Sequence, residues 1–279
     1  LADLDGDERL EIIVAALDAQ VYAWNADGLT MSGFPVGGFK DPSDPLKPFT
    51  LMKFEYQGKE SYQRRRIISS PAVGDLDGDG NLEIVGGTNE SIREAYSLLY
   101  AFSYDKKANR PVAYKPECGS GKRCFPIVMS GAYPDALPYV GEGTAGSPVL
   151  ADLNGDGTLE IGATAIADFG RIYQHDGFDA ANATASAYRV LKNIEGFYGQ
   201  NSNSHQASSL AMICSGAFGD VDGDFVPDFF LGTAGIDFVN NLKTDGQRAD
   251  FDHQLSGWTT TDGAMLKGFP QIMEDLFQK

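Results

Sequence analysis

The chain has 279 residues, of which 42% are hydrophobic and 33 are glycine, and its formal net charge is −17. This length is enough for one large or two ordinary domains, and the many glycines with 11% aromatic residues favour strands and turns over long helices. The negative charge argues against nucleic acid and anionic membranes as partners. No apolar run reaches the roughly 18 residues that a membrane span needs.

Four strongly acidic segments of nine residues, nearly identical to one another, recur along the chain. Each has a carboxylate or amide at positions 1, 3 and 5, an acid at position 9 and an apolar run after it. The segments begin at Asp3, Asp75, Asp152 and Asp220. These positions hold 15 carboxylates, so four divalent ions would bring the formal charge from −17 to −9. Much of the acidity is therefore interpreted as a set of metal ligands.

The first predicted unit, residues 1–36, has no strand before its acidic segment. Apolar strands are predicted over residues 11–16 and 21–24, followed by a turn at 26–28 and a strand that closes on Gly33-Phe-Pro35. Because Leu1 opens almost directly onto the acidic segment, we expect the chain to be an internal piece of a longer polypeptide.

The next three predicted units cover residues 67–127, 145–200 and 213–271. A strand of small residues precedes each acidic segment, at residues 70–74, 147–151 and 215–219. An apolar strand follows each segment, at residues 83–87, 160–164 and 228–232. An aromatic-bearing strand comes next, at residues 99–102, 171–173 and 255–258. The fourth unit closes through a turn at 261–263 and Gly268-Phe-Pro270, and Cys124-Phe-Pro126 is the predicted counterpart in the second unit.

Four short strands per unit, with unit starts 72, 77 and 68 residues apart, predict an all-β fold of the β-propeller type. Each blade would be a four-stranded antiparallel meander that buries its faces only by stacking on its neighbours. A solenoid is the alternative, although its repeats would be shorter and more uniform.

The strand–DxDGDG–strand pattern with a trailing acid resembles the FG-GAP or VCBS repeat of the integrin α-chain propeller head and of bacterial exported proteins. The resemblance covers essentially all 279 residues. It implies a ring of seven blades, of which this chain supplies about four. Three blades would then lie elsewhere in the polypeptide, or another chain would complete the ring. A closed ring of four blades is the alternative.

Oxygen ligands at alternate positions of a tight turn suit a hard cation, and Ca²⁺ accepts six to eight of them in irregular geometry. As in the first half of an EF-hand, we expect side chains at positions 1, 3 and 5, the carbonyl at position 7 and the acid at position 9 to bind. The predicted ligands of up to four calcium ions are Asp3, Asp5, Asp7, the Arg9 carbonyl and Glu11; Asp75, Asp77, Asp79, the Asn81 carbonyl and Glu83; Asp152, Asn154, Asp156, the Thr158 carbonyl and Glu160; and Asp220, Asp222, Asp224, the Val226 carbonyl and Asp228. Solvated acidic turns without an ion are the alternative.

Position 6 of such a loop turns sharply and favours glycine. Gly80 and Gly157 fit this requirement, whereas Glu8 and Phe225 do not, so the second and third sites rank above the fourth and the first. We expect the ion to be structural, because crowded carboxylates repel one another without it. With the ion bound, the loop would clasp the first two strands of a blade.

Strand direction alternates within a blade, so the acidic loops should share one face and most long insertions the other. The insertions at residues 37–69, 117–146 and 234–253 are predicted opposite the acidic loops. Residues 176–212 span a turn between strands 3 and 4 and a connection between blades, so no face is assigned to them. Long loops on a rigid scaffold often carry binding. We therefore expect a protein or glycan ligand there, and the rest of a larger polypeptide or assembly as a further partner.

Within the insertions, residues 37–48 are Pro-rich and residues 64–66 are three arginines. The arginines could pair with nearby acids or meet an anionic partner. Residues 198–206 are polar and rich in amides, which suits hydrogen bonds to sugars or peptide backbone but also an ordinary surface loop. Asn182 begins a glycosylation sequon, a pattern that is frequent by chance.

Cys118 and Cys124 flank a short flexible spacer, which favours a disulfide and an oxidising compartment. Two buried thiols are the alternative. Cys214 lies in an apolar stretch and is interpreted as a core residue. A disulfide and calcium loops together indicate an extracellular or cell-surface location.

The favoured function is a non-catalytic binding or scaffolding module, for which integrin-like relatives offer the precedent. Some polysaccharide lyases also resemble this arrangement of calcium-loop blades, so an enzyme or an accessory domain of a secreted enzyme is the alternative. The three histidines, His175, His205 and His253, lie in three different predicted loops, and no Gly-x-Ser-x-Gly or HExxH motif is present. A structural spacer within a larger assembly is a third possibility.

Overall fold

A computed structural model of the chain describes residues 1–16, 20–37, 54–56, 59–61, 69–90, 97–114, 125, 127–129, 142–143, 146–164, 170–179, 184–185, 189–190, 208–211, 215–236, 251–269 and 271–272. These residues form strands and turns and no helix, so the predicted all-β class is confirmed. Accordingly, none of them lies in a helix long and apolar enough to cross a membrane.

Four antiparallel sheets follow one another along the chain. The first sheet contains β1 (Ile12–Ala15), β2 (Gln20–Trp24) and β3 (Val36–Gly37). The second contains β6 (Ala72–Gly74), β7 (Glu83–Gly87), β9 (Ser97–Asp105) and β10 (Arg110–Ala113), with β11 (Ile127–Met129) also paired to β9. The third contains β13 (Val149–Ala151), β14 (Glu160–Thr164), β15 (Gly170–Tyr173) and β18 (Arg189–Val190). The fourth contains β20 (Ala217–Gly219), β21 (Asp228–Ile236), β22 (Phe251–Trp258) and β23 (Gln271–Ile272), with β19 (Ser208–Ala211) paired to β21.

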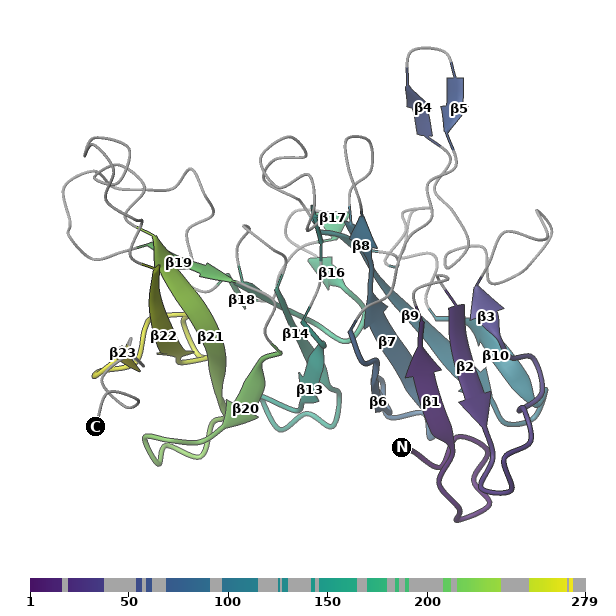
Figure 1. The fold of residues 1–279 in the computed structure, drawn as a ribbon. Helices are drawn as coiled ribbons and strands as arrows, with labels where there is room; N and C mark the ends of the chain where they lie inside the picture. Colours follow the sequence, from purple (N-terminus) through teal and green to yellow (C-terminus); the bar gives the residue numbers. More distant parts are fainter. Residues whose placement is uncertain are drawn as a thin grey trace.

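Three smaller two-stranded ladders lie outside these sheets. They are β4 (Phe54–Tyr56) with β5 (Lys59–Ser61), β8 (Asn89–Glu90) with β12 (Glu142–Gly143), and β16 (Phe178–Asp179) with β17 (Thr184–Ala185). The β4–β5 hairpin stands at the edge of the molecule opposite the acidic loops (Figure 1).

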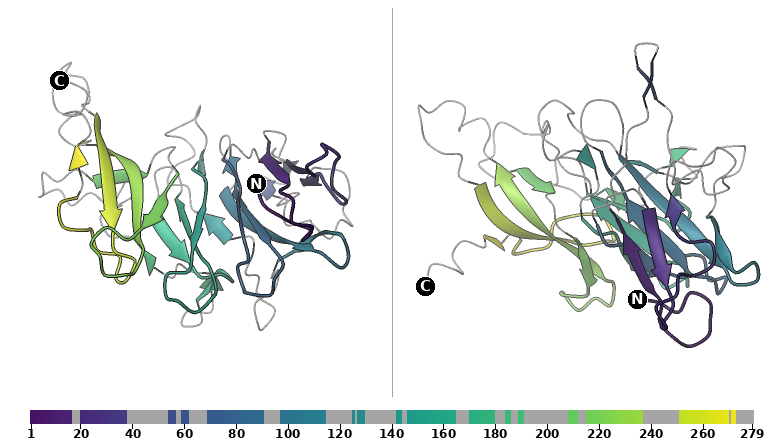
Figure 2. Two further views of the ribbon diagram at one scale, coloured as in Figure 1. Left: turned by 90° about the horizontal axis from the view of Figure 1, so that it is seen from below. Right: turned by 45° about the vertical axis from the view of Figure 1, so that its right-hand side comes forward.

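The four sheets stand side by side in chain order (Figure 1). The first strands of the last three sheets are neighbours, because β13 contacts both β6 and β20. Seen from below, the sheets form an open row (Figure 2). The described residues do not close this row into a ring or a barrel.

The predicted strands after the acidic segments are present, and the register aligns the units closely. Residues at equivalent places in the third strand, Val21, Leu99 and Leu255, pair with Val36, Ile127 and Gln271. Each of these three partners directly follows a Phe-Pro dipeptide. The predicted correspondence of Cys124-Phe-Pro126 with the other two Phe-Pro sites therefore fits the observed pairing.

The last strand of a unit differs from the expectation that it closes on Phe-Pro. In the first sheet the pairing before Phe-Pro is a single bridge between Trp24 and Thr30, and the strand resumes after Pro35 as β3. Proline has no N–H to donate to a sheet ladder, and Phe34 turns into the core with 8% of its surface exposed. The edge strand is therefore broken at this dipeptide.

The hydrophobic core consists of three clusters, each shared by two successive sheets. In the first cluster Phe34 of the first sheet stacks on Tyr104 of the second, with ring centroids 6.0 Å apart, and makes a tilted contact with Phe102, with centroids 6.3 Å apart. The second cluster joins Val85 to Ile161, and the third joins Leu153 to Trp258. Strands β7 and β14 are buried along their whole length, because a sheet covers each of their faces.

Several sequence predictions fall outside the described residues. They concern Cys118, Cys124, Cys214, the arginines at 64–66, residues 38–48 of the Pro-rich stretch, Asn182 and the polar residues 198–206. The disulfide and the properties of these loops therefore stay predictions.

Candidate metal centres

The second, third and fourth acidic segments form the turns between β6 and β7, β13 and β14, and β20 and β21, and the first segment precedes β1. All four turns lie at one edge of the molecule (Figure 1). The residue before each segment pairs with the acid at position 9. In three sheets these pairs are Gly74 with Glu83, Ala151 with Glu160 and Gly219 with Asp228. In the first sheet the leading strand is reduced to one bridge, between Ala2 and Glu11.

The carboxylate at position 1 holds the turn together by accepting backbone N–H groups. Asp152 accepts from Gly155 at 2.7 Å and from Gly157 at 2.9 Å. Asp3 accepts from Gly6 at 2.7 Å and from Glu8 at 3.0 Å. The other two loops follow the same scheme: Gly80 donates to Asp75 at 2.9 Å, and Phe225 donates to Asp220 at 3.0 Å. Positions 4 to 6 are thereby wrapped around the first carboxylate.

The carboxylate at position 5 holds the backbone of position 7 in place. The carbonyl of position 7 is a predicted metal ligand. The N–H of position 7 donates to the carboxylate of position 5 at 2.8 Å in every loop, in the pairs Arg9–Asp7, Asn81–Asp79, Thr158–Asp156 and Val226–Asp224. The Thr158 hydroxyl also donates to Asp156 at 2.6 Å, and these hydrogen bonds hold the pKa of Asp156 below its usual range.

The acid at position 9 is buried beneath the loop. Glu11, Glu83 and Glu160 are each 1% exposed and Asp228 is 2% exposed. Each accepts a hydrogen bond from the backbone N–H of position 2, from Leu4 at 2.7 Å, Leu76 at 2.8 Å, Leu153 at 2.8 Å and Val221 at 3.1 Å. One oxygen of the acid is thereby engaged by the backbone of the loop.

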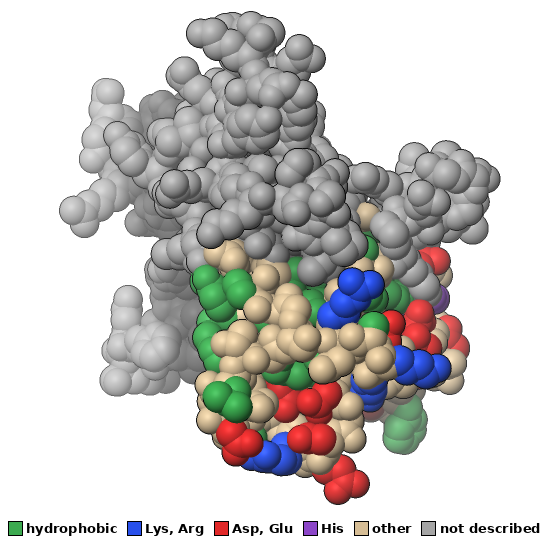
Figure 3. Space-filling model, turned by 90° about the vertical axis from the view of Figure 1, so that its right-hand side faces the viewer, with side chains coloured by type: hydrophobic (Ala, Val, Ile, Leu, Met, Phe, Trp, Pro, Cys, Tyr) green, Lys and Arg blue, Asp and Glu red, His purple; other side chains and the backbone are tan. Residues whose placement is uncertain are grey.

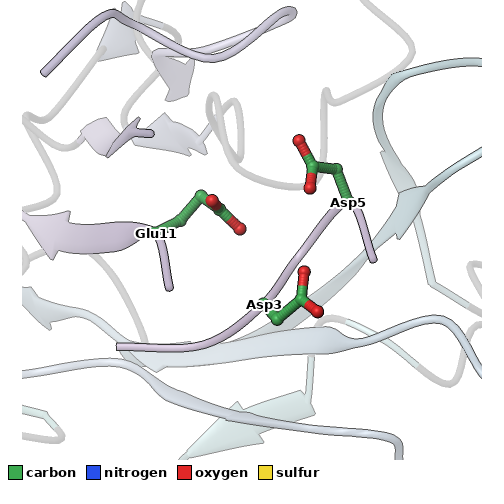
Figure 4. Close-up of side chains that lie close together, drawn as sticks. All are labelled: Asp3, Asp5 and Glu11. Atoms are coloured by element: carbon green, nitrogen blue, oxygen red, sulfur yellow. The ribbon is translucent and has the colours of Figure 1, made fainter. Parts of the chain in front are cut away.

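In three loops the carboxylates at positions 1, 3 and 9 converge, with one oxygen from each lying within 4.8 Å of the others. In the first loop Asp3 and Asp5 come from the turn and Glu11 from the start of β1, and the three side chains surround a common space (Figure 4). The same clusters are Asp75, Asp77 and Glu83, and Asp220, Asp222 and Asp228. All three clusters could hold a metal ion.

The third loop has the same backbone with an amide at position 3. The Asn154 amide donates to Asp156 at 3.0 Å and to Glu160 at 3.4 Å. Asn154 Oδ1 accepts from the Asp156 N–H at 2.9 Å. This loop therefore offers two carboxylates and an amide oxygen at positions 1, 3 and 9, which carries less negative charge than the other three loops.

Burial and mutual repulsion raise the pKa values of the acids at position 9. Burial raises the pKa of Glu83 to about 7, and the charges of Asp77 and Asp79 add to the effect. The pKa values of Glu11, Glu160 and Asp228 are also raised, in each case mainly by burial. A divalent cation would favour the ionised acids, because an opposite charge nearby stabilises the charged form.

The sharp turn at position 6 is present in all four loops. Gly80 and Gly157 have φ of 86°, and Glu8 and Phe225 adopt φ of 68° although they are not glycine. Position 4 is also left-handed, with φ between 74° and 83° at Gly6, Gly78, Gly155 and Gly223. Our sequence reasoning missed the role of position 4, although glycine stands there in every segment.

The loops contact one another and the neighbouring turns. Leu159 N–H donates to Leu76 carbonyl oxygen at 3.0 Å, which links the third unit to the second loop. Lys106, in the turn after β9, donates to the Gly80 carbonyl at 2.8 Å. Arg9 forms a salt bridge with Asp27 at 2.7 Å on the surface. The first three loops are thereby held by groups outside their own nine residues.

Comparison with models of known protein families, with curated proteins and with solved structures found no match. The resemblance to FG-GAP and VCBS repeats therefore stays an interpretation of the sequence pattern.

Proposed function

We propose that this chain is a calcium-stabilised segment of a β-propeller of the FG-GAP or VCBS type. The observation that carries the proposal is the fourfold recurrence of one loop geometry, in which a buried acid at position 9 lies beneath alternating oxygen ligands. Calcium suits this ligand set, because it prefers oxygen and tolerates irregular coordination. The contact of β13 with β6 and β20 supports the propeller, because the first strands of neighbouring blades lie together in such a ring.

The ions would be structural and would lock the turn between the first two strands of each blade. They would offset the repulsion among carboxylates that the loop geometry brings together. An ion that binds only the folded chain stabilises it, by about 2.7 kcal/mol per site at a free concentration 100 times the dissociation constant. Several such sites would make a large share of the stability of the chain depend on calcium.

The module would serve extracellular binding or scaffolding, with a protein or glycan ligand at the face opposite the calcium loops. The position of the β4–β5 hairpin at that face supports this proposal (Figure 1). Binding residues are often carried on loops that a rigid scaffold positions.

Thermal unfolding of the whole chain tests the calcium part of the proposal. We expect saturating EDTA to lower the melting temperature by 10 °C or more, on the order of several kcal/mol, and excess calcium to restore it. Magnesium serves as the matched control, because it demands regular octahedral geometry and should restore much less. An unchanged melting temperature in EDTA would refute the structural role of calcium.

A glycan array and a panel of extracellular-matrix proteins test the binding part. A hit on the array would make the module a lectin, and a protein hit would make it an adhesin. If the calcium-loaded chain bound nothing in either set, the scaffolding role would remain and the ligand-binding role would be abandoned.

A further inference from the structure

A backbone hydrogen bond joins the second and third acidic loops. The N–H of Leu159, at position 8 of the third loop, donates at 3.0 Å to the carbonyl oxygen of Leu76, at position 2 of the second loop. The two loops also meet nearby, since a Cβ atom at Gly78 would lie 3.5 Å from the carbonyl oxygen of Gly157. The backbones of two neighbouring candidate metal sites therefore touch each other.

Both ends of this hydrogen bond belong to peptide groups that help to build the candidate sites. The N–H of Leu159 shares its peptide group with the carbonyl of Thr158, which is the predicted metal ligand at position 7. At the other end, the N–H of Leu76 donates to Glu83 at 2.8 Å, and the carbonyl of Leu76 shares its peptide group with the N–H of Asp77. Glu83 and Asp77 belong to the second carboxylate cluster. The hydrogen bond therefore connects ligands of one loop to ligands of the next.

The fourth loop lacks the donor for an equivalent bond to the third loop. Position 8 of the fourth loop is Pro227, and proline has no backbone N–H. In other respects the second and fourth loops are alike, because each carries carboxylates at positions 1, 3, 5 and 9. Strand β13, which leads into the third loop, contacts both β6 and β20. The chain therefore contains two pairs of neighbouring loops that differ in the capacity for this hydrogen bond.

We propose that the second and third calcium sites bind cooperatively through the bond from Leu159 to Leu76, and that the third and fourth sites lack this coupling. The inference rests on the proposed calcium sites and adds an interaction between them. A cation on the Thr158 carbonyl would polarise the peptide group and make the Leu159 N–H a stronger donor, since linked hydrogen-bonding groups polarise one another. An ion in the second loop would in turn hold Leu76 in place as the acceptor. By linkage, each ion would raise the affinity of the other by the same factor.

Repulsion between neighbouring ions opposes this coupling. Figure 3 shows acidic side chains at the lower edge of the molecule, where they face solvent, and exposed charges are screened over about 8 Å at physiological ionic strength. The second and fourth loops carry the same number of carboxylates, so repulsion acts alike on both pairs. A difference in coupling between the two pairs therefore isolates the effect of the hydrogen bond.

The test measures calcium binding to the whole chain by isothermal titration calorimetry. Alanine in place of the acid at position 1 removes one site at a time, and combinations leave either one site or one pair of neighbouring sites. The four changes are Asp3→Ala, Asp75→Ala, Asp152→Ala and Asp220→Ala. For each pair, the coupling factor is the overall constant for binding both ions divided by the product of the two single-site constants. A factor of one means that the sites are independent.

We expect a coupling factor of about five or more for the second and third sites, at the lower end of typical coupling between sites. The third and fourth sites should give a factor of about one or less. Leu159→Pro, which copies the natural Pro227, should lower the first factor to that of the second pair. Leu159→Ala is the matched control, because it also removes the leucine side chain but keeps the N–H, and it should retain the coupling.

Equal coupling factors for the two pairs, or a factor at or below one for the second and third sites, would overturn the inference and leave the calcium sites in place. Coupling that survives in folded Leu159→Pro would also contradict it. A chain that binds no calcium would overturn the proposed function together with the inference. Should Leu159→Pro fail to fold in thermal unfolding, the comparison of the two natural pairs decides, because Pro227 already removes the donor from one of them.

Discussion

The backbone N–H of Leu76 donates a hydrogen bond of 2.8 Å to the carboxylate of Glu83, and both residues are buried. The bond spans the whole acidic loop, from its second residue to its ninth. It satisfies a buried N–H group that would otherwise cost about 1–3 kcal/mol. One carboxylate oxygen of Glu83 also lies within 4.8 Å of oxygens of Asp75 and Asp77. One side chain therefore closes the turn and completes the candidate metal site.

Replacement of Glu83 separates these two roles. Glu83→Gln keeps an acceptor for Leu76 but removes the charge, so in EDTA it should be at least as stable as the wild type near pH 8. In calcium it should gain less stability than the wild type. Glu83→Ala should lose about 1–3 kcal/mol even in EDTA, because the N–H of Leu76 loses its acceptor. Urea unfolding gives the free energy of unfolding of all three proteins, with calcium and with EDTA.

Glu8→Gln is the matched control for this experiment, because Glu8 lies in an acidic loop but is exposed and is not a predicted ligand. The prediction would be wrong if Glu83→Gln gained as much stability from calcium as Glu8→Gln does.

The raised pKa of Glu83 makes stability depend on pH. Burial raises this pKa from 4.5 to about 7, so the folded metal-free chain keeps a proton that the unfolded chain releases. The free energy of unfolding of the metal-free chain should therefore fall as pH rises from about 4.5 to about 7. Calcium needs the ionised acid, so its stabilising effect should grow over the same interval.

Urea unfolding in EDTA at several pH values across this interval tests the direction of this pH dependence. The wild type is compared with Glu83→Gln. The wild type should lose stability relative to the variant as pH rises. A difference that is constant with pH, or one of the opposite sign, would show that Glu83 is not held protonated by burial.

Phe225 carries backbone strain that glycine would relieve. Its φ is 68° and its side chain is 93% exposed, so Phe225→Gly loses no packing and removes a left-handed penalty of about 1–2 kcal/mol. The greater flexibility of unfolded glycine offsets part of this gain. We expect a net stabilisation of up to about 1 kcal/mol in urea unfolding.

The reciprocal change supplies the control. Gly80 stands at the same position of the second loop with φ of 86° and has open space around it, so Gly80→Ala should cost about 1 kcal/mol through strain alone. If Phe225→Gly and Gly80→Ala shifted stability in the same direction, the left-handed conformation at position 6 would not be the cause of these changes in stability.

Gly162 lies where the third and fourth sheets pack tightly against each other. A Cβ atom there would lie 2.8 Å from Phe229 Cε2 and 2.9 Å from Phe218 Cζ. Gly162→Ala should therefore destabilise the chain by about 1–3 kcal/mol through overpacking. Gly86→Ala is the matched control, since a Cβ atom at Gly86 in β7 would have nothing within 4 Å. Equal effects of the two changes in differential scanning calorimetry would contradict the sheet-to-sheet packing.

The strands beside the acidic loops could be predicted because their signals are local and repeated. Glu83, Glu160 and Asp228 begin their strands as expected, since each follows a fixed turn and precedes an apolar run. The tight turn at Glu8 and Phe225 was also predictable, because position 6 is glycine in the other two loops.

Features that depend on distant pairing could not be predicted in this way. Strand β19 pairs with the far half of β21, well downstream in the chain. This pairing joins strands that share no local pattern. The bond from Leu76 to Glu83 was missed for another reason, because its donor is a backbone N–H group and any residue at position 2 could supply it.

Calcium binding to the whole chain tests the central claim most directly. Equilibrium dialysis of the metal-free chain should show about four calcium ions per molecule, one for each acidic loop. Asp75→Ala, which removes the carboxylate that organises the second loop, should reduce that number by one. A wild-type chain that binds no calcium at millimolar concentrations would contradict the account.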